Sequence, residues 1–133
     1  MKLIVCLDDK NGMLFNHRRQ SRDRVLIENL ERLVDGETLY LMPYSESLFL
    51  NRRLCYRVTE DPFTDVGDAY CFLETVDPAP YKDMIPEIVM YRWNRHYPSD
   101  LWFTLNLEDY YLTERVDFVG SSHEKITREV WKK

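Results

Sequence analysis

The chain has 133 residues, of which 44% are hydrophobic and 14% aromatic, and it carries a formal net charge of −5. This length and composition predict one ordinary globular domain spanning residues 1–133. The negative charge argues against a general nucleic-acid or anionic-membrane binder, and no apolar run approaches the ~18 residues of a membrane span.

The first part of the chain predicts a strand, a long loop and a helix. A short apolar run indicates a strand over residues 2–8, which ends at a polar, glycine-containing turn. Residues 9–20 are predicted to form a loop. Ser21 is the expected N-cap of a helix over residues 22–34, whose apolar residues recur at helical spacing and which ends at an Asp-Gly pair.

The middle of the chain alternates short strands with short helices. The predicted strands cover residues 38–42, 54–58, 69–74 and 87–93. A short helix is expected over residues 43–50 and a short turn or helix over residues 81–85, with loops over residues 59–67 and 94–108.

The last part of the chain predicts an antiparallel hairpin. Apolar residues alternate over 110–118, a Gly-Ser-Ser turn follows, and apolar residues recur over 126–130. Strands alternating with short helices and followed by a hairpin are typical of an α/β sandwich with a mixed sheet.

The order of these elements resembles the dihydrofolate reductase family. In that family an apolar strand leads to a G-(I/M) pair, as it does here to Gly12-Met13. An acid near the start of the next helix is similar to Asp23, and an E-S pair on a short helix is similar to Glu46-Ser47.

Two further motifs of the family have counterparts in the second half of the chain. Tyr97-Pro98 and Trp102 are similar to its F-P-x(n)-W motif, and Ser122-His123 is similar to the S-H pair in its terminal hairpin. The resemblance implies a dihydrofolate-reductase-like three-layer sandwich, with a central mixed sheet flanked by a few helices and a C-terminal antiparallel hairpin.

The cofactor motifs of the family are not matched. Leu41 and Met42 stand where the family has a glycine and a basic residue that receive the cofactor's phosphate. Glu74-Thr75 replaces a glycine pair beside the pyrophosphate, and this carboxylate would repel a phosphate. The chain is also shorter between Leu50 and Asp68. The resemblance therefore implies a domain that has lost its NADPH site and uses no cofactor.

A ligand pocket is expected at the end of the first strand, because ligands bind outside the carboxyl ends of strands in such sheets. The candidate ligand-binding residues are Val5, Cys6, Met13, Phe15, Arg22, Asp23, Ile27 and Tyr91. Residues 12–15 are expected to form either a mobile flap over this pocket or a surface loop pinned by its apolar side chains.

The role of Asp23 can be interpreted in two ways. It is the only acid placed like the family's substrate-anchoring carboxylate, where burial would raise its pKa and let it bind the amidine edge of a pterin-like ring. The alternative is an acid that is favoured at the start of a helix by the helix dipole.

Four arginines within eight residues form a candidate anion site in this acidic chain. They are Arg18, Arg19, Arg22 and Arg24. Guanidinium groups and a helix N-terminus both attract phosphate or another anion. The alternative is a solvated loop and helix face whose arginines pair with acids elsewhere.

The histidines and cysteines indicate neither a metal site nor a disulfide framework. No histidine lies in an H-x-H or H-E-x-x-H motif, and His123 is assigned to the terminal hairpin. A ribonuclease Z function is discounted, because that family needs an H-x-H-x-D-H cluster. Without a C-x-x-C motif or a secretory signal, Cys6, Cys55 and Cys71 are expected to be reduced core residues in a cytoplasmic protein.

Three functions remain open at this point. The first is a binding domain for a small molecule with a flat ring or a phosphate, without a cofactor. The second is an oxidoreductase of the dihydrofolate reductase class with altered use of a nicotinamide or flavin. The third is a non-enzymatic interaction domain, in which exposed aromatic residues of the second half form a homodimer contact.

Overall fold

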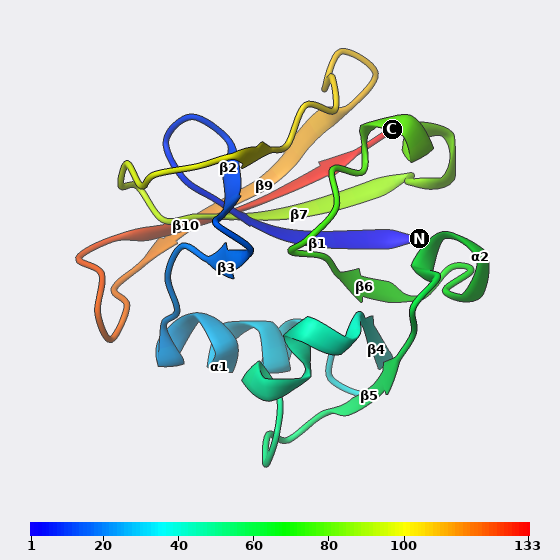
Figure 1. Cartoon of the computed structure of the whole chain (residues 1–133), viewed down its shortest axis with the longest axis horizontal. Coiled ribbons are helices and arrows are strands. Elements are labelled where there is room, and N and C mark those ends of the chain that lie inside the picture. The colour runs from blue at the N-terminus through cyan, green and yellow to red at the C-terminus, as the bar shows by residue number, and fades with distance from the viewer.

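The computed structural model describes all residues from Met1 to Lys133, and its centre is a mixed seven-stranded sheet (Figure 1). From one edge to the other the strands are β5 (Cys55–Val58), β4 (Thr38–Leu41), β6 (Tyr70–Phe72), β1 (Lys2–Leu7), β7 (Glu87–Arg92), β10 (Ile126–Lys132) and β9 (Tyr111–Phe118). The first five strands run parallel, and the β9–β10 hairpin joins β7 in antiparallel pairing.

One face of the sheet is covered by α1 (Arg24–Leu33) and the 3-10 helix η1 (Pro43–Leu48) (Figure 1). The apolar stripe of α1 buries Leu26, Ile27 and Leu30 against side chains of the sheet. Because side chains alternate along a strand, Ile4 and Cys6 of β1 lie on this face. Cys6 on this face also lines a cavity at the carboxyl end of the strand.

The opposite face is covered mainly by irregular chain. A second apolar cluster joins the residues of β1 on that face to β2 (Gly12–Phe15) and to the segment containing Phe103, Leu105 and Tyr110. The short helix α2 (Pro62–Asp65) and the 3-10 helix η2 (Ala79–Met84) lie at the end of the sheet where the strand β1 begins (Figure 1). The predicted three-layer α/β arrangement with a terminal hairpin is confirmed.

The predicted loop over residues 9–20 is wrong, because a second, small sheet forms there. β2 and β3 (Arg18–Arg19) pair as a hairpin, and β8 (Leu101–Trp102) adds a third strand from within the predicted loop 94–108. The turn between β2 and β3 is Asn16-His17, with φ values of 51° and 60°. Two consecutive residues with positive φ match the twist of paired strands.

Three local predictions also need correction. Asp23 caps α1 in place of Ser21, because its carboxylate accepts hydrogen bonds from the backbone N–H groups of Val25 and Leu26. Within the predicted loop 59–67, proline at the first helical position starts α2. Cys71 is buried, whereas Cys55 is exposed on the edge strand β5, and all three cysteines are unpaired. None of the helices is both long and apolar enough to cross a membrane.

Candidate functional site

A cavity lies at the carboxyl ends of β1 and β6, between α1, η1 and the β2–β3 hairpin. Its apolar wall is formed by Cys6, Met13, Leu26, Ile27, Leu48, Phe72, Leu73 and Trp93. Its polar wall is formed by Arg19, Gln20, Ser21, Arg22, Asp23 and Glu74. Only about 20 Å³ inside this wall is free, which is room for about one water molecule.

An ion pair between Arg19 and Glu74 closes one side of this cavity. The Arg19 Nε and Nη2 atoms donate to the two Glu74 carboxylate oxygens at 2.8 and 2.9 Å. Ser45, which is buried in η1, donates to Glu74 Oε2 at 2.7 Å. The guanidinium carbon of Arg19 lies 4.7 Å from the centroid of the Tyr44 ring, whose hydroxyl accepts from the Arg19 backbone N–H. Both charges are therefore satisfied within the protein.

The structure brings together five of the eight predicted ligand-binding residues at the cavity, namely Cys6, Met13, Arg22, Asp23 and Ile27. The other three lie elsewhere. Val5 points to the opposite face of the sheet, because it is one residue from Cys6 on the same strand. Tyr91 is buried beneath α1 and donates to Asn29 Oδ1 at 2.7 Å. Phe15 is 47% exposed at the end of β2, beside Arg18 and Tyr97.

Asp23 links the start of α1 to the loop between β9 and β10, about a hundred residues away. Its Oδ1 accepts from the backbone N–H of Ser121 at 2.9 Å, and its Oδ2 accepts from that of Ser122 at 2.8 Å. His123 Nδ1 lies 2.9 Å from Oδ2. Together with the two helix N–H groups, these contacts place five nitrogen atoms around one carboxylate that is 97% buried.

The expected raised pKa of Asp23 is wrong. Burial alone would raise it, but the backbone N–H groups of Ser121 and Ser122, the His123 ring and the N–H of Leu26 hold the pKa well below its usual range. Asp23 is therefore an ionised anchor with no free hydrogen-bonding position for the amidine edge of a ligand.

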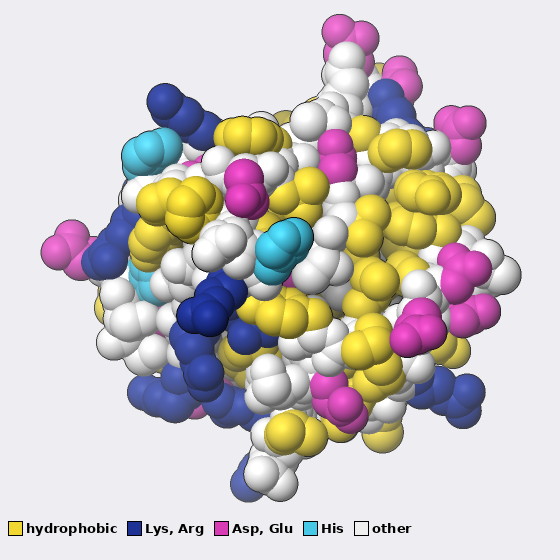
Figure 2. Space-filling view, viewed as in Figure 1, with side chains coloured by type: hydrophobic (Ala, Val, Ile, Leu, Met, Phe, Trp, Pro, Cys, Tyr) yellow, Lys and Arg dark blue, Asp and Glu magenta, His cyan; other side chains and the backbone are white.

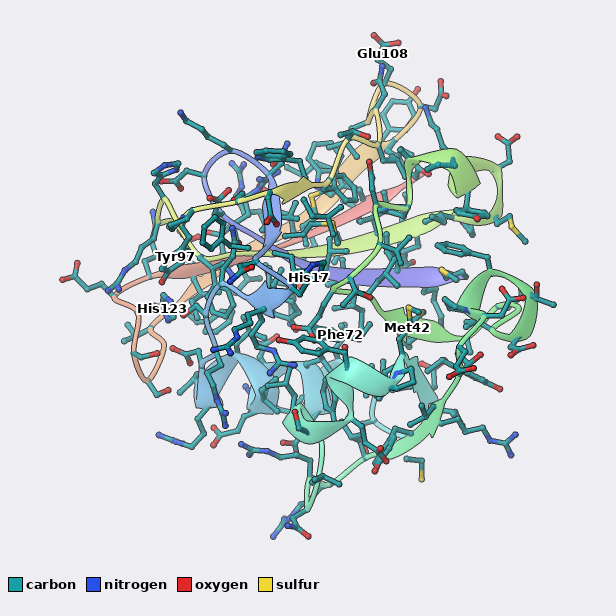
Figure 3. The ribbon with its side chains drawn as sticks, in the orientation of Figure 1. His17, Met42, Phe72, Tyr97, Glu108 and His123 are labelled. Atoms are coloured by element: carbon teal, nitrogen blue, oxygen red, sulfur yellow. The ribbon has the colours of Figure 1, made fainter.

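His123 extends this network toward the cavity, where Figure 3 shows it beside Tyr97. Its Nε2 lies 2.9 Å from the Tyr97 hydroxyl and 3.1 Å from Ser21 Oγ. The ring stacks on Trp93 with a centroid separation of 4.6 Å. The sequence prediction assigned His123 to the hairpin alone and missed this role, since the contact spans 100 residues and no local motif signals it.

A separate open groove of about 330 Å³ lies beside the N-terminal end of α1. Three arginines line it, Arg22, Arg24 and Arg52, together with Ser121 and the apolar side chains of Ile27 and Leu48. Arg24 pairs with Glu28 at 2.7 Å and Arg52 with Glu31 at 3.5 Å, whereas Arg22 is exposed and has no ion pair. Figure 2 shows Lys and Arg side chains gathered over this side of the molecule.

The four arginines predicted as one anion site separate into three environments. Arg22 and Arg24 share the open groove, Arg19 is occupied by Glu74, and Arg18 lies on β3 beside Phe15. Arg52 belongs to the groove but was missed, because it follows η1 and is distant from the other arginines in sequence. No group of three or more histidine, cysteine or acidic side chains could hold a metal ion.

We expect Gly120→Ala to destabilise the fold. A Cβ atom at Gly120 would lie 2.9 Å from both Asp23 Cγ and Ile126 Cδ1, which is closer than carbon atoms pack. The free energy of unfolding should fall by about 1–3 kcal/mol, measured by urea denaturation. Val119→Ala is the control, because Val119 is 73% exposed and should change it by less than about 0.5 kcal/mol. Equal urea midpoints for the two variants would contradict the packing argument.

We also expect Asp23→Asn to make the stability less dependent on pH. The lowered pKa of Asp23 stabilises the folded state above the unfolded pKa of about 3.9, and this contribution is lost as pH falls through the folded pKa. The variant should therefore be less stable by about 2–4 kcal/mol at pH 7, with a smaller difference below about pH 4. Urea denaturation at a series of pH values measures this; a difference that stays constant down to pH 3 would contradict it.

Comparison with known proteins gives a likeness in structure alone. No family model matches the sequence, and no curated protein matches it either. Among solved structures, it is similar to a dihydrofolate reductase from Enterococcus faecalis complexed with NADP(H) and RAB-propyl. The TM-score is 0.70, the alignment covers 98% of this chain and 94% of that chain, and the sequence identity is 9%. The chain therefore has a dihydrofolate-reductase-like fold.

Proposed function

We propose that the chain is a small-ligand-binding protein of dihydrofolate-reductase-like fold that recognises an anionic group and has lost the NADPH site. The observation that carries this proposal is the open groove lined by Arg22, Arg24 and Arg52. Guanidinium groups present several donors to a phosphate or carboxylate, and Arg22 has no acidic partner inside the protein.

Several features of the groove suit a ligand with a charged end. Asp23 also lines it, but its carboxylate is engaged by buried donors and its side chain is not exposed. Ile27 and Leu48 provide an apolar floor for a ring or a short chain. A phosphate or carboxylate at the arginines with its remaining atoms on this floor fits both surfaces.

The loss of the NADPH site is supported by the Arg19–Glu74 ion pair. The similar reductase is complexed with NADP(H), and the resemblance places the cofactor's pyrophosphate at the end of the strand that here runs into Glu74. A pyrophosphate at this position would be repelled by Glu74 and would separate Glu74 from Arg19 and Ser45. Breaking one side of such a part-buried charge pair is costly.

A non-enzymatic interaction domain is the second candidate. β9 is an edge strand of the central sheet, and seven of its eight residues are exposed. Tyr111 and Val119, at and just beyond its ends, are 75% and 73% exposed. An unpaired edge of this length can pair with a second copy of the chain.

The three unpaired cysteines suit a reducing compartment, and we place the protein in the cytoplasm.

Pyrophosphate should bind the wild-type protein, and Arg52→Ala should weaken this binding roughly 10- to 100-fold, the loss expected for one charge-assisted contact. Isothermal titration calorimetry measures the dissociation constant. Arg53→Ala is the matched control, because it removes the same charge from the next residue, which lies outside the groove. Equal weakening by both variants would show that net charge, and no defined groove, attracts the anion.

NADPH should raise the melting temperature no more than 2′-phospho-ADP-ribose does. The two compounds share their phosphates and both riboses, so the comparison isolates the nicotinamide ring of the cofactor. A ligand stabilises the folded state by about 2.7 kcal/mol at a hundred times its dissociation constant, so a specific cofactor gives a clear thermal shift. A larger shift with NADPH would overturn the loss of the cofactor site and favour an oxidoreductase. No shift with any anion, together with a concentration-dependent dimer, would favour the interaction domain.

A further inference from the structure

Three side chains beside the cavity form a continuous hydrogen-bonded chain in the order carboxylate, imidazole, hydroxyl. Asp23 Oδ2 lies 2.9 Å from His123 Nδ1, and His123 Nε2 lies 3.1 Å from Ser21 Oγ. In nucleophilic catalysis a hydroxyl is activated by a base, which a third group holds in position. This is the spatial order of a Ser-His-Asp triad, which is recognised by its geometry and occurs on unrelated folds.

The buried carboxylate fixes which nitrogen of His123 faces the serine as an acceptor. Asp23 is ionised and can only accept hydrogen bonds, so the hydrogen of the neutral imidazole lies on Nδ1. The Nε2 lone pair then faces the Ser21 hydroxyl. The ring itself is buried and stacked on Trp93, which holds its plane.

We propose that Ser21 is a nucleophile with His123 as its general base and Asp23 as the group that positions the imidazole, for hydrolysis of a small acyl ester. Ser21 Oγ attacks the acyl carbonyl carbon while His123 Nε2 takes the hydroxyl proton. Collapse of the tetrahedral intermediate breaks the ester C–O bond, and His123 returns this proton to the leaving alcohol. Water then attacks the acyl-serine, again through Nε2, and releases the carboxylic acid and free Ser21.

The surroundings of Ser21 provide access for a substrate and a place for water. Ser21 is part-exposed, and it lines the cavity that has room for about one water molecule. Gln20 precedes Ser21 and lines the same cavity, and its buried Oε1 atom has no hydrogen-bond partner in the protein, so it can accept from a water molecule there. The following residue is Arg22, whose positive charge favours the oxyanion that develops on the acyl group.

The substrate class follows from the neighbouring groove, and this step rests on the proposed function. Arg22 and Asp23 line both the cavity and the arginine groove, so the two spaces adjoin. An ester with its acyl carbon at Ser21 can place an anionic alcohol half against Arg24 and Arg52. A small acyl ester of a phosphate- or carboxylate-bearing alcohol is therefore the class that fits.

Two other side chains near the triad are excluded as the nucleophile. Ser122 Oγ lies 3.2 Å from His123 Nδ1 and 3.2 Å from Asp23 Oδ2, so it is on the side of the ring that already carries the hydrogen. The Cys6 thiol lines the cavity, but burial raises its pKa, so it remains protonated and weakly nucleophilic.

Tyr97 competes with Ser21 for the same nitrogen. Its hydroxyl lies 2.9 Å from His123 Nε2, and a neutral imidazole nitrogen has a single lone pair. When Tyr97 donates to Nε2, the base is occupied and Ser21 is not activated. Removing this hydroxyl should therefore make Ser21 more reactive, which a purely structural network does not predict.

The test is covalent labelling of the full chain with an alkyl fluorophosphonate, which forms a bond from a nucleophilic serine oxygen to phosphorus and releases fluoride. Mass spectrometry of the intact protein and of its peptides gives the rate and the labelled residue. The folded wild-type protein should take up one label, on Ser21, and the protein unfolded in urea should take up none. Ser21→Ala should remove the label, and Tyr97→Phe should be labelled faster than the wild type.

Matched controls separate this proposal from the anion groove. Ser122→Ala should keep the label, because it removes a serine that touches the same histidine from the other side. Ser21→Ala should lose the label but bind pyrophosphate as the wild type does, because Ser21 does not line the arginine groove, so each proposal can fail without the other. Failure of the folded protein to label at Ser21, equal labelling of Ser21 and Ser122, or slower labelling of Tyr97→Phe would overturn the nucleophile.

Discussion

The carboxylate of Asp23 is the contact on which the arrangement of the site depends. It caps the N-terminus of α1, and its two oxygens also accept hydrogen bonds from the backbone of the β9–β10 loop. A buried charge is tolerated only when hydrogen-bond donors surround it. Separating the helix from the loop would leave the carboxylate and its donors without partners, at a large cost in free energy. His123, Ser21 and the arginine groove take their positions from this junction.

A second constraint lies at the carboxyl edge of the central sheet. Arg19 comes from the β2–β3 hairpin and Glu74 from the end of β6, so their ion pair ties the small sheet to the carboxyl edge of the large one. Ser45 and Tyr44 of η1 complete the tie. A side-chain network thus occupies an edge where open α/β sheets usually bind ligands, and the remaining accessible space lies outside it, beside α1.

The sequence predicted the large elements well, because their signals are local. The apolar runs of β1 and β7 and the helical spacing of apolar residues in α1 can each be recognised within a dozen or fewer consecutive residues. The β2–β3 hairpin was not predicted, because its turn is Asn16-His17, which lacks the glycine that usually marks a turn with two positive φ values. The N-cap was placed two residues early, since Ser21 and Asp23 are both good caps and only the loop contacts decide between them.

The candidate site was only partly predictable, because its contacts join distant segments. Cys6 and Asp23 could be placed near a pocket from strand direction and resemblance, whereas Val5 could not be separated from Cys6 until the register of β1 was known. The backbone N–H groups of Ser121 and Ser122, together with the His123 ring, lower the pKa of the Asp23 carboxyl, which is opposite to the expected direction. No periodicity or motif carries information about a contact of this sequence separation.

The position of β10 has a consequence for folding. β10 follows both β7 and β9 in the chain but lies between them in the sheet. A partly folded state in which β10 has not docked would therefore leave a free edge on β7, whose Ile88, Val89 and Met90 are fully or almost fully buried in the native sheet. An open apolar edge of this kind readily pairs with other chains. Docking of this one strand thus covers the edge at which partly folded chains would pair.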